Sequence, residues 1–169
     1  SLNNLAALSK SVSVPQYRRD MLSPGILHFG VGNFHRAHQA VYLNELFNKG
    51  KDHDWAIIGS GVQPADALMH GALARQDFLT TVVEQEAALS TARVTGSMID
   101  FISPGDRSGM LAQLVDPAIR IVSLTVTEGG YFIDPATGVF NPEDPKIAHD
   151  AAHSQDPATV FGLIALGLA

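Results

Sequence analysis

Residues 26–38 carry the strongest signal in this sequence, and they read Ile-Leu-His-Phe-Gly-Val-Gly-Asn-Phe-His-Arg-Ala-His. The apolar residues that open the stretch predict a strand over about 26–30, and the apolar spacing that follows predicts a helix over about 34–48. Gly30 and Gly32 lie between the two. A strand, a glycine turn and a helix in this order are typical of a dinucleotide-binding unit, in which backbone amides approach a pyrophosphate at the start of the helix.

The glycine pattern by itself leaves two interpretations open. The usual G-x-G-x-x-G motif has a third glycine, and His35 stands in its place here. A bare G-x-G is a weak signal. Gly30 and Gly32 could form a cofactor turn, or a turn that needs glycine only for its backbone conformation.

The composition is that of an ordinary globular protein. The chain has 169 residues, of which 46% are hydrophobic and 17% charged, enough to bury a core in one domain. A formal net charge of −6 without a basic cluster argues against a nucleic-acid partner. No apolar run reaches about 18 residues, which argues against a membrane span. The absence of cysteine excludes disulfides and thiol chemistry and suits a cytoplasmic location.

Apolar runs and helix-like segments alternate along the rest of the chain. Residues 1–25 are interpreted as an N-terminal arm, and 26–169 as an α/β domain with a Rossmann-like, mainly parallel sheet and flanking helices. The segment 85–91 could turn a hairpin, although part of it could equally be helical, and 132–145 is expected to be rich in turns. Further strands are expected at about 55–59, 78–84, 92–97 and 119–126, and further helices at about 66–76 and 106–116.

The two ends of the sequence indicate a piece of a longer polypeptide. The chain starts at Ser1, and its last residues, 159–169, form an apolar helix-like run without a charged last turn or a polar tail. Such a surface must be buried against something. We therefore expect the α/β domain to be truncated at its C-terminus.

Two acids occupy positions suited to the carboxyl edge of a parallel sheet, which lines the ligand crevice. Asp66 is the first acid after the second predicted strand, where it could accept hydrogen bonds from an adenosine ribose, although its position alone favours a helix N-cap. No Lys or Arg occurs in 60–74, so a ribose 2′-phosphate has no partner there and NAD is favoured over NADP. Glu128 follows the strongest strand and could touch a substrate, a proton path or only solvent.

The seven histidines do not form a recognisable metal pattern. His35 and His38 are three positions apart on one predicted helix face, but no further ligand completes a zinc-like spacing. We therefore expect no metal site. His35, near the helix start, could donate to a phosphate or to a backbone carbonyl, and His38 could be a satisfied core histidine.

Two longer strings are more specific than the glycines. Residues 30–40, Gly-Val-Gly-Asn-Phe-His-Arg-Ala-His-Gln-Ala, and 121–131, Ile-Val-Ser-Leu-Thr-Val-Thr-Glu-Gly-Gly-Tyr, resemble signatures of the polyol-specific long-chain dehydrogenase/reductase family, the mannitol dehydrogenase group. Residues 55–62, 96–97 and 147–150 also fall in family-like order. The resemblance covers nearly the whole chain. It implies NAD-dependent interconversion of a polyol such as mannitol, or of a sugar acid, with its ketose.

The resemblance also implies roles for particular residues. Asp66 matches the acid that binds the cofactor ribose, and Ala65 replaces the acid that often precedes it, so Asp66 alone would discriminate against NADP. Glu128 matches an acid beside the substrate and proton-transfer region, and is an accessory candidate. The family works without a catalytic metal. The expected cofactor-binding residues are Gly30, Gly32, Asn33, Phe34, His35, Arg36, Asp66, Thr125 and Thr127.

The family's general base is a lysine in a second, mostly helical domain, in a Lys-x-x-x-x-Asn-x-x-His pattern. None of the four lysines of this chain begins that pattern; they are Lys10, Lys49, Lys51 and Lys146. We therefore expect no catalytic residue and no catalytic C-terminal domain in this chain, and at best weak NAD affinity. Its partners would be a small polyol or sugar-acid substrate and that missing domain. The alternative is a stand-alone dinucleotide-binding or sensor module without catalysis.

Overall fold

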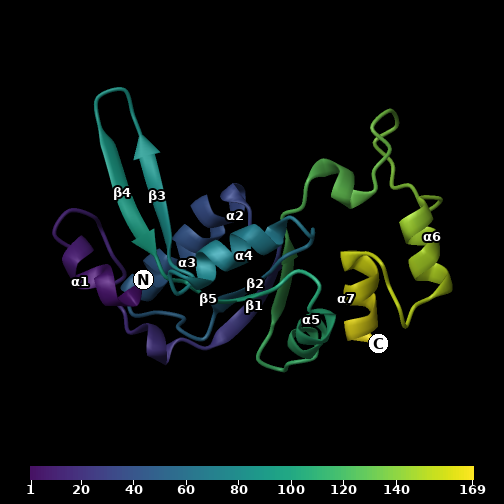
Figure 1. Ribbon diagram of the computed structural model, residues 1–169, viewed down its shortest axis with the longest axis horizontal. Coiled ribbons are helices and arrows are strands. Elements are labelled where there is room, and N and C mark those ends of the chain that lie inside the picture. Colours follow the sequence, from purple (N-terminus) through teal and green to yellow (C-terminus); the bar gives the residue numbers. More distant parts are fainter.

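The computed structural model describes residues 1–169, except for the side chain of Glu128. Its centre is a four-stranded sheet with the strand order β5-β2-β1-β6 (Figure 1). All pairings within this sheet are parallel. The prediction of a Rossmann-like α/β domain with a mainly parallel sheet is therefore confirmed. The four strands are β1 (Pro24–Phe29), β2 (Ala56–Ser60), β5 (Met98–Ile102) and β6 (Ile121–Leu124).

The order of the strands places the turn after β1 at the centre of one sheet edge. Phe29, the last residue of β1, pairs with Ser60 at the end of β2 and with Leu124 at the end of β6. The chain runs from β1 to β2 on one side and later to β6 on the other, so β1 lies at a topological switch point. Open α/β sheets bind ligands at such a point, outside the carboxyl ends of the strands.

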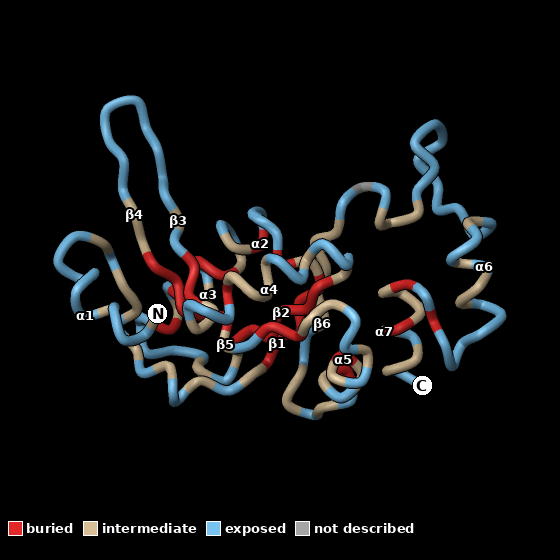
Figure 2. The backbone as a smooth tube through the Cα atoms, in the orientation of Figure 1, coloured by how far each residue is buried: buried red, intermediate tan, exposed pale blue. Residues whose placement is uncertain are grey.

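Helices cover both faces of the sheet, because side chains alternate between the faces along each strand. Ile26 belongs to the apolar cluster that includes residues of α3 (Gln39–Asn48) and α4 (Asp66–Ala74). Leu27 and Phe29 belong to the cluster on the other face, with α5 (Arg107–Leu114) and α7 (Val160–Leu168). Burial is deepest along the central strands (Figure 2). Within the described chain, none of the helices is both long and apolar enough to cross a membrane.

Two further strands form a separate antiparallel hairpin that extends from the body (Figure 1). They are β3 (Thr80–Gln85) and β4 (Ser90–Thr95). A backbone hydrogen bond of 2.8 Å from Glu86 N to Leu89 O closes the turn between them. The hairpin interpretation of 85–91 is therefore confirmed, and the helical alternative is wrong.

The sequence did not predict β5, although β5 is part of the central sheet. Asp100 interrupts its apolar pattern, and only Gly96 and Ser97 separate it from β4. Two strands that follow each other so closely are not separated by a clear turn signal. The strand expected at 92–97 therefore ran across the end of β4, and β5 was not predicted as a strand of its own. The expected strand at 119–126 is also shorter in the structure, where β6 has four residues.

One helix prediction needs correction, and one helix was not predicted. The expected helix over 34–48 is divided into α2 (Asn33–Ala37) and α3 at His38, which has φ −122° and ψ −81°. The ring of His38 lies over the same break, with Nδ1 2.8 Å from Phe34 O. Helix α6 (Pro145–Ala152) begins at the last residue of the segment expected to be turn-rich, and its N-cap Asp144 accepts a hydrogen bond of 2.9 Å from Lys146 N. An Asp N-cap followed by proline is a helix start, which the turn interpretation overlooked.

The expected N-terminal arm is partly built into the domain. It contains three short helices, η1 (Leu2–Asn4), α1 (Leu5–Leu8) and η2 (Arg19–Met21), and its last two residues belong to β1. The hydroxyl of Tyr17 lies 2.7 Å from Oδ1 of Asn44 on α3, and burial raises the pKa of Tyr17. Arg19 donates to the carbonyls of Gly96 (2.9 Å) and Met98 (2.8 Å). These contacts attach the second half of the arm to α3 and to the edge strand β5.

Candidate functional site

A pocket of about 210 Å³ lies beside the turn after β1. Three segments form it: the glycine turn, the stretch after β2, and the stretch after β6. Five of the nine expected cofactor residues line it, and these are Gly30, Gly32, Asp66, Thr125 and Thr127. A neighbouring pocket of about 140 Å³ shares the residue Val62 with it. Each is smaller than the roughly 300–1,000 Å³ of a typical small-molecule site, so one pocket would take only part of a dinucleotide.

The two glycines of the turn are needed for different reasons. Gly30 has φ +92°, and a Cβ there would lie 2.3 Å from the carbonyl oxygen of Thr125. The fold itself therefore requires glycine at this position. A Cβ on Gly32 would meet no atom within 4 Å, and its φ of −85° suits any residue. Nothing within the chain requires Gly32 to be glycine, which is the arrangement expected where a ligand approaches the backbone.

The first turn of α2 adds positive charge beside the pocket. Its first internal hydrogen bond runs from Arg36 N to Gly32 O at 3.2 Å, so the amides before Arg36 lie at the positive end of the helix. The Arg36 side chain returns to this turn, where it donates to Gly32 O (3.3 Å) and to Oδ1 of Asn33. Asn33, Phe34 and Arg36 do not line the pocket. Phe34 is 65% exposed and stacks on His38 with ring centroids 4.4 Å apart.

The histidines lie differently from what the sequence indicated. His35 is 1% exposed and is absent from the pocket lining, so a phosphate in this pocket is out of its reach. Its Nδ1 instead lies 2.9 Å from Oε1 of Gln39. His38 is exposed and is not a core histidine. Sequence reasoning overlooked His28, which is also 1% exposed and stacks on His35 at 3.8 Å. A histidine inside an apolar strand was the signal that could have found it.

Burial keeps the imidazoles of this pair neutral. Burial lowers the pKa of His28 to about 4. Burial, together with the neighbouring His28, lowers the pKa of His35 to about 3. Both rings therefore carry a single N–H near neutral pH, and each has one donor and one acceptor nitrogen.

Asp66 is the first residue of α4 and does not cap it. The N-cap is Ala65, whose side chain makes no capping bond. The Oδ2 atom of Asp66 accepts hydrogen bonds of 2.8 Å from Val62 N and of 2.8 Å from Gln63 N. The N-cap interpretation is therefore wrong. The carboxylate instead holds the loop after β2 against the pocket, and neither of these bonds uses Oδ1.

The remaining candidates contribute less. Glu128 begins η3 (Glu128–Tyr131), directly after Thr127, and its side chain lies outside the described residues. All four lysines are exposed, and none lines the pocket. Among the described side chains, no group of three or more histidines and acids could hold a metal ion.

A parallel sheet with a glycine turn at its switch point and an acid after the second strand defines a Rossmann-type nucleotide-binding domain. Comparison with known proteins then gives the family. The chain matches the family described as the mannitol dehydrogenase Rossmann domain over residues 24–169, which is most of its length. It therefore belongs to the mannitol dehydrogenase family.

Relatives with curated names agree with this assignment. The chain is 54% identical to mannitol 2-dehydrogenase of Cereibacter sphaeroides, over 95% of this chain and 34% of that protein. It is 42% identical to polyol:NADP oxidoreductase of Gluconobacter oxydans, over 95% of this chain and 33% of that protein. The chain thus spans about a third of the length of these relatives.

A solved structure shows the same fold. The chain superposes on the Pseudomonas fluorescens mannitol 2-dehydrogenase ternary complex with NAD and D-mannitol with a TM-score of 0.91 and 43% identity. The superposition covers 98% of this chain and 34% of that one. Most of the present chain therefore corresponds to one part of a larger protein.

Proposed function

We propose that this chain is the NAD-binding part of a dehydrogenase that interconverts a polyol, or a sugar acid, with its ketose. The observation that carries the proposal is the contrast between the two glycines. Gly30 is required by the fold, whereas Gly32 leaves open space at the start of α2 beside the pocket. A side chain at Gly32 would occupy the space that a pyrophosphate needs to reach the backbone. The NAD and D-mannitol in the related Pseudomonas fluorescens complex support the same assignment.

Different residues of the chain would bind different parts of the dinucleotide. The glycine turn and the amides of α2 would hold the pyrophosphate, with Arg36 adding a positive charge. Asp66 would accept hydrogen bonds from the adenosine ribose, while Thr125 and Thr127 border the pocket next to β6. Bound NAD supplies the capacity for hydride transfer. No lysine lines the pocket among the described residues, so the general base would come from elsewhere in the complete enzyme.

The preference for NAD over NADP rests on Asp66. Its carboxylate would repel a ribose 2′-phosphate, and no Lys or Arg in 60–74 offsets that repulsion. One relative is named a polyol:NADP oxidoreductase, so the choice of cofactor varies among proteins similar to this one. Titration with both dinucleotides, for the wild type and for Asp66→Asn, tests this preference. We expect the wild type to bind NAD more tightly than NADP, and Asp66→Asn to reduce the difference between the two affinities.

The glycine contrast gives the main test. We expect Gly32→Val to weaken NAD binding at least ~10-fold while the melting temperature stays nearly unchanged. The new side chain would enter only the open space proposed for the ligand and would contact no other part of the chain. Gly30→Ala is the matched control, and it should lower the free energy of unfolding by about 2 kcal/mol or more. Calorimetric titration measures the affinity. The proposal fails if the wild type shows no NAD binding at millimolar concentration, or if Gly32→Val binds like the wild type.

The reporter of binding should not be tryptophan fluorescence. Trp55 precedes β2 and therefore lies at the amino edge of the sheet, opposite the pocket. It packs there against Arg120, whose guanidinium carbon lies 3.6 Å from the ring centroid. Calorimetry and thermal shift avoid this problem.

We expect the purified 169-residue chain to oxidise no polyol. None of its four lysines reaches the pocket, so nothing in the described site can take up the hydroxyl proton as the family's lysine would. NADH absorbance during incubation with mannitol, arabinitol and sorbitol measures this. Turnover by the chain alone would contradict the assignment of the base to another part of the enzyme. The sensor alternative finds no support in the relatives, whose names are those of dehydrogenases and an oxidoreductase.

A further inference from the structure

A row of polar side chains lies beneath the glycine turn; its two histidines are buried, and Gln39, Ser123 and Thr125 are partly buried. Of these residues, only Thr125 also lines the pocket. His28 extends from β1 toward α2, where its ring stacks on His35 with an interplanar angle of 16°. Ser123 and Thr125, on and just after β6, flank His28 on its two nitrogen atoms. The row therefore connects α2, β1 and β6 below the turn.

The direction of each hydrogen bond follows from the one group that can only accept. The carbonyl oxygen of Gly30 accepts from the hydroxyl of Thr125 at 2.7 Å. A hydroxyl has one proton, so Thr125 Oγ1 must be the acceptor in its 2.9 Å contact with Nε2 of His28. His28 therefore carries its proton on Nε2. Its Nδ1 is then an acceptor, and the Ser123 hydroxyl donates to it at 2.8 Å.

The same reasoning continues to His35. The oxygen of Ser123 is 3.5 Å from Nε2 of Gln39, which donates to it. The other end of that amide, Oε1, accepts from Nδ1 of His35 at 2.9 Å. His35 therefore carries its proton on Nδ1, and its Nε2 is a buried acceptor with no partner among the described residues. All five bonds run in one direction, from His35 to the carbonyl of Gly30.

The end of this chain coincides with the centre of the cofactor turn. Gly30 O also accepts from Gly32 N at 2.8 Å, so this one oxygen holds the turn closed. Gly30 lies against Thr125 without room for a Cβ, and Thr125 lines the pocket. An imidazole at His28 loses hydration on burial, and its two hydrogen bonds compensate for that loss. Both of these bonds go to the segment that supports the turn.

We propose that His28 is a positioning residue for the dinucleotide turn: it acts through the hydroxyl of Thr125, which it orients as a donor to Gly30 O. This inference rests on the proposed function, in which that turn binds NAD. His28 is buried and does not line the pocket, so its effect on binding is indirect.

The test measures NAD affinity and thermal stability for paired variants of the purified protein. His28→Leu removes the donor, and we expect NAD to bind ~10-fold more weakly, the equivalent of one lost hydrogen bond. His28→Gln can place an amide N–H near the former Nε2 and should restore most of the affinity. Thr95→Val is the matched control. It removes another buried hydrogen bond, the 2.6 Å contact between Thr80 and Thr95, and should lower stability without changing affinity.

A double-mutant cycle separates positioning from general destabilisation. Thr125→Val alone should reduce affinity about as much as His28→Leu, and the two together should lose little more, because both act on the same bond to Gly30 O. Additive losses would overturn the proposal, as would wild-type affinity in His28→Leu or an equal loss of affinity in Thr95→Val.

Nitrogen NMR tests the hydrogen-bond chain without any cofactor. We expect the neutral ring of His28 to be protonated on Nε2 and that of His35 on Nδ1, and the opposite assignment would overturn the chain of donors. If the wild type binds no NAD, the proposed function fails and the positioning role fails with it. Wild-type binding combined with normal affinity in His28→Leu rejects the positioning role alone.

Discussion

At the scale of single residues, the turn after β1 depends on side chains that no glycine motif describes. Gly30 can adopt its positive φ because it has no Cβ, but the position of its carbonyl also depends on Thr125 and, beneath it, on His28. The place of the third glycine in the usual motif is taken by His35, which is buried as the stacking partner of His28. His35 is therefore part of the support of the turn and not a contact of the pocket.

The buried histidine pair should make stability depend on pH. The pKa of His28 falls from 6.5 to about 4 on burial, and that of His35 falls to about 3. Well above pH 6.5 neither the folded nor the unfolded chain protonates these rings, so their contribution to stability is complete. As the pH falls from 6.5 toward 4, the unfolded chain binds protons that the folded chain does not, and the free energy of unfolding decreases.

The size of this effect is measurable. We expect a loss of about 1.4 kcal/mol per pH unit for each histidine within that window. Urea unfolding at pH 7 and pH 5 gives the difference. His28→Gln should reduce the slope, whereas His153→Gln, which changes an exposed ring at the C-cap of α6, should leave it unchanged. An equal slope in His28→Gln and the wild type would show that the pair does not titrate in this way.

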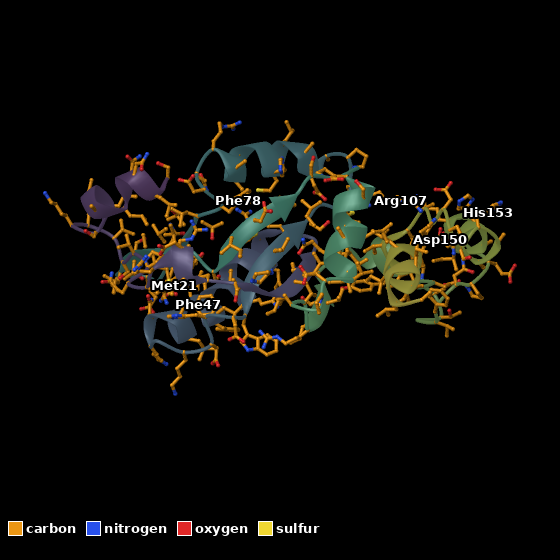
Figure 3. All side chains as sticks on the ribbon, turned by 90° about the horizontal axis from the view of Figure 1, so that it is seen from below. Met21, Phe47, Phe78, Arg107, Asp150 and His153 are labelled. Carbon is orange, nitrogen blue, oxygen red and sulfur yellow. The ribbon has the colours of Figure 1, made fainter. Side chains whose placement is uncertain are left out.

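At the scale of elements, α6 and α7 are connected through one carboxylate. Oδ1 of Asp150 accepts from Ala158 N, while Oδ2 accepts from the amide and the hydroxyl of Thr159, the N-cap of α7. Burial raises the pKa of Asp150, but these hydrogen bonds outweigh burial and leave it below its usual value. An ion pair of 2.7 Å between Arg107 and Asp156 adds a second link, from α5 to the same connection. Figure 3 labels Arg107 on α5 and Asp150 on α6.

We expect Asp150→Ala to destabilise α7 by about 1–2 kcal/mol, because the amides of Ala158 and Thr159 and the Thr159 hydroxyl would lose the carboxylate that accepts their hydrogen bonds. Hydrogen exchange of the amides in α7 measures the effect. Lys146→Ala changes an exposed side chain of α6 and is the matched control. Equal protection of α7 in both variants would show that Asp150 is not what holds this connection.

At the scale of the whole molecule, stability is concentrated in the sheet and not in the hairpin. β1 and β2 are buried over nearly their full length, whereas most residues from Thr81 to Thr91 are exposed (Figure 2). An isolated two-stranded hairpin is only marginally stable in water. The base of this one is nevertheless fastened to the body, since Thr80, Val94 and Thr95 are buried.

We expect amides in the outer hairpin, residues 83–91, to exchange with solvent at least ~100-fold faster than those of β1 and β2, because opening the hairpin exposes little apolar surface. Hydrogen-exchange mass spectrometry resolves these peptides. Proteases should also cut first in this segment. Protection equal to that of the central strands would indicate that the hairpin is covered in solution, for instance by another copy of the chain.

Local sequence patterns predicted the parts of the fold that depend on neighbouring residues. The apolar run before Gly30 predicted β1, and the segment 106–116 was predicted as the helix that forms α5, for which the structure shows Asp106 as the N-cap. The same local signals were misread at Pro145, where a helix start was taken for a turn. β5 was missed because it is stabilised by pairing with β2 and by packing against helices that are distant in sequence.

The sequence by itself determined the family, the parallel α/β class and the identity of the glycine turn, because short strings such as Phe-His-Arg-Ala-His and Thr-Glu-Gly-Gly-Tyr are specific without any coordinates. Only the tertiary structure decided what each residue does there. Asp66 accepts hydrogen bonds from the loop after β2 and does not cap α4. Gly32 faces open space, and His28 supports the turn from below. These roles depend on contacts between β1 and segments up to 97 positions away, as between His28 and Thr125, and no local pattern contains such contacts.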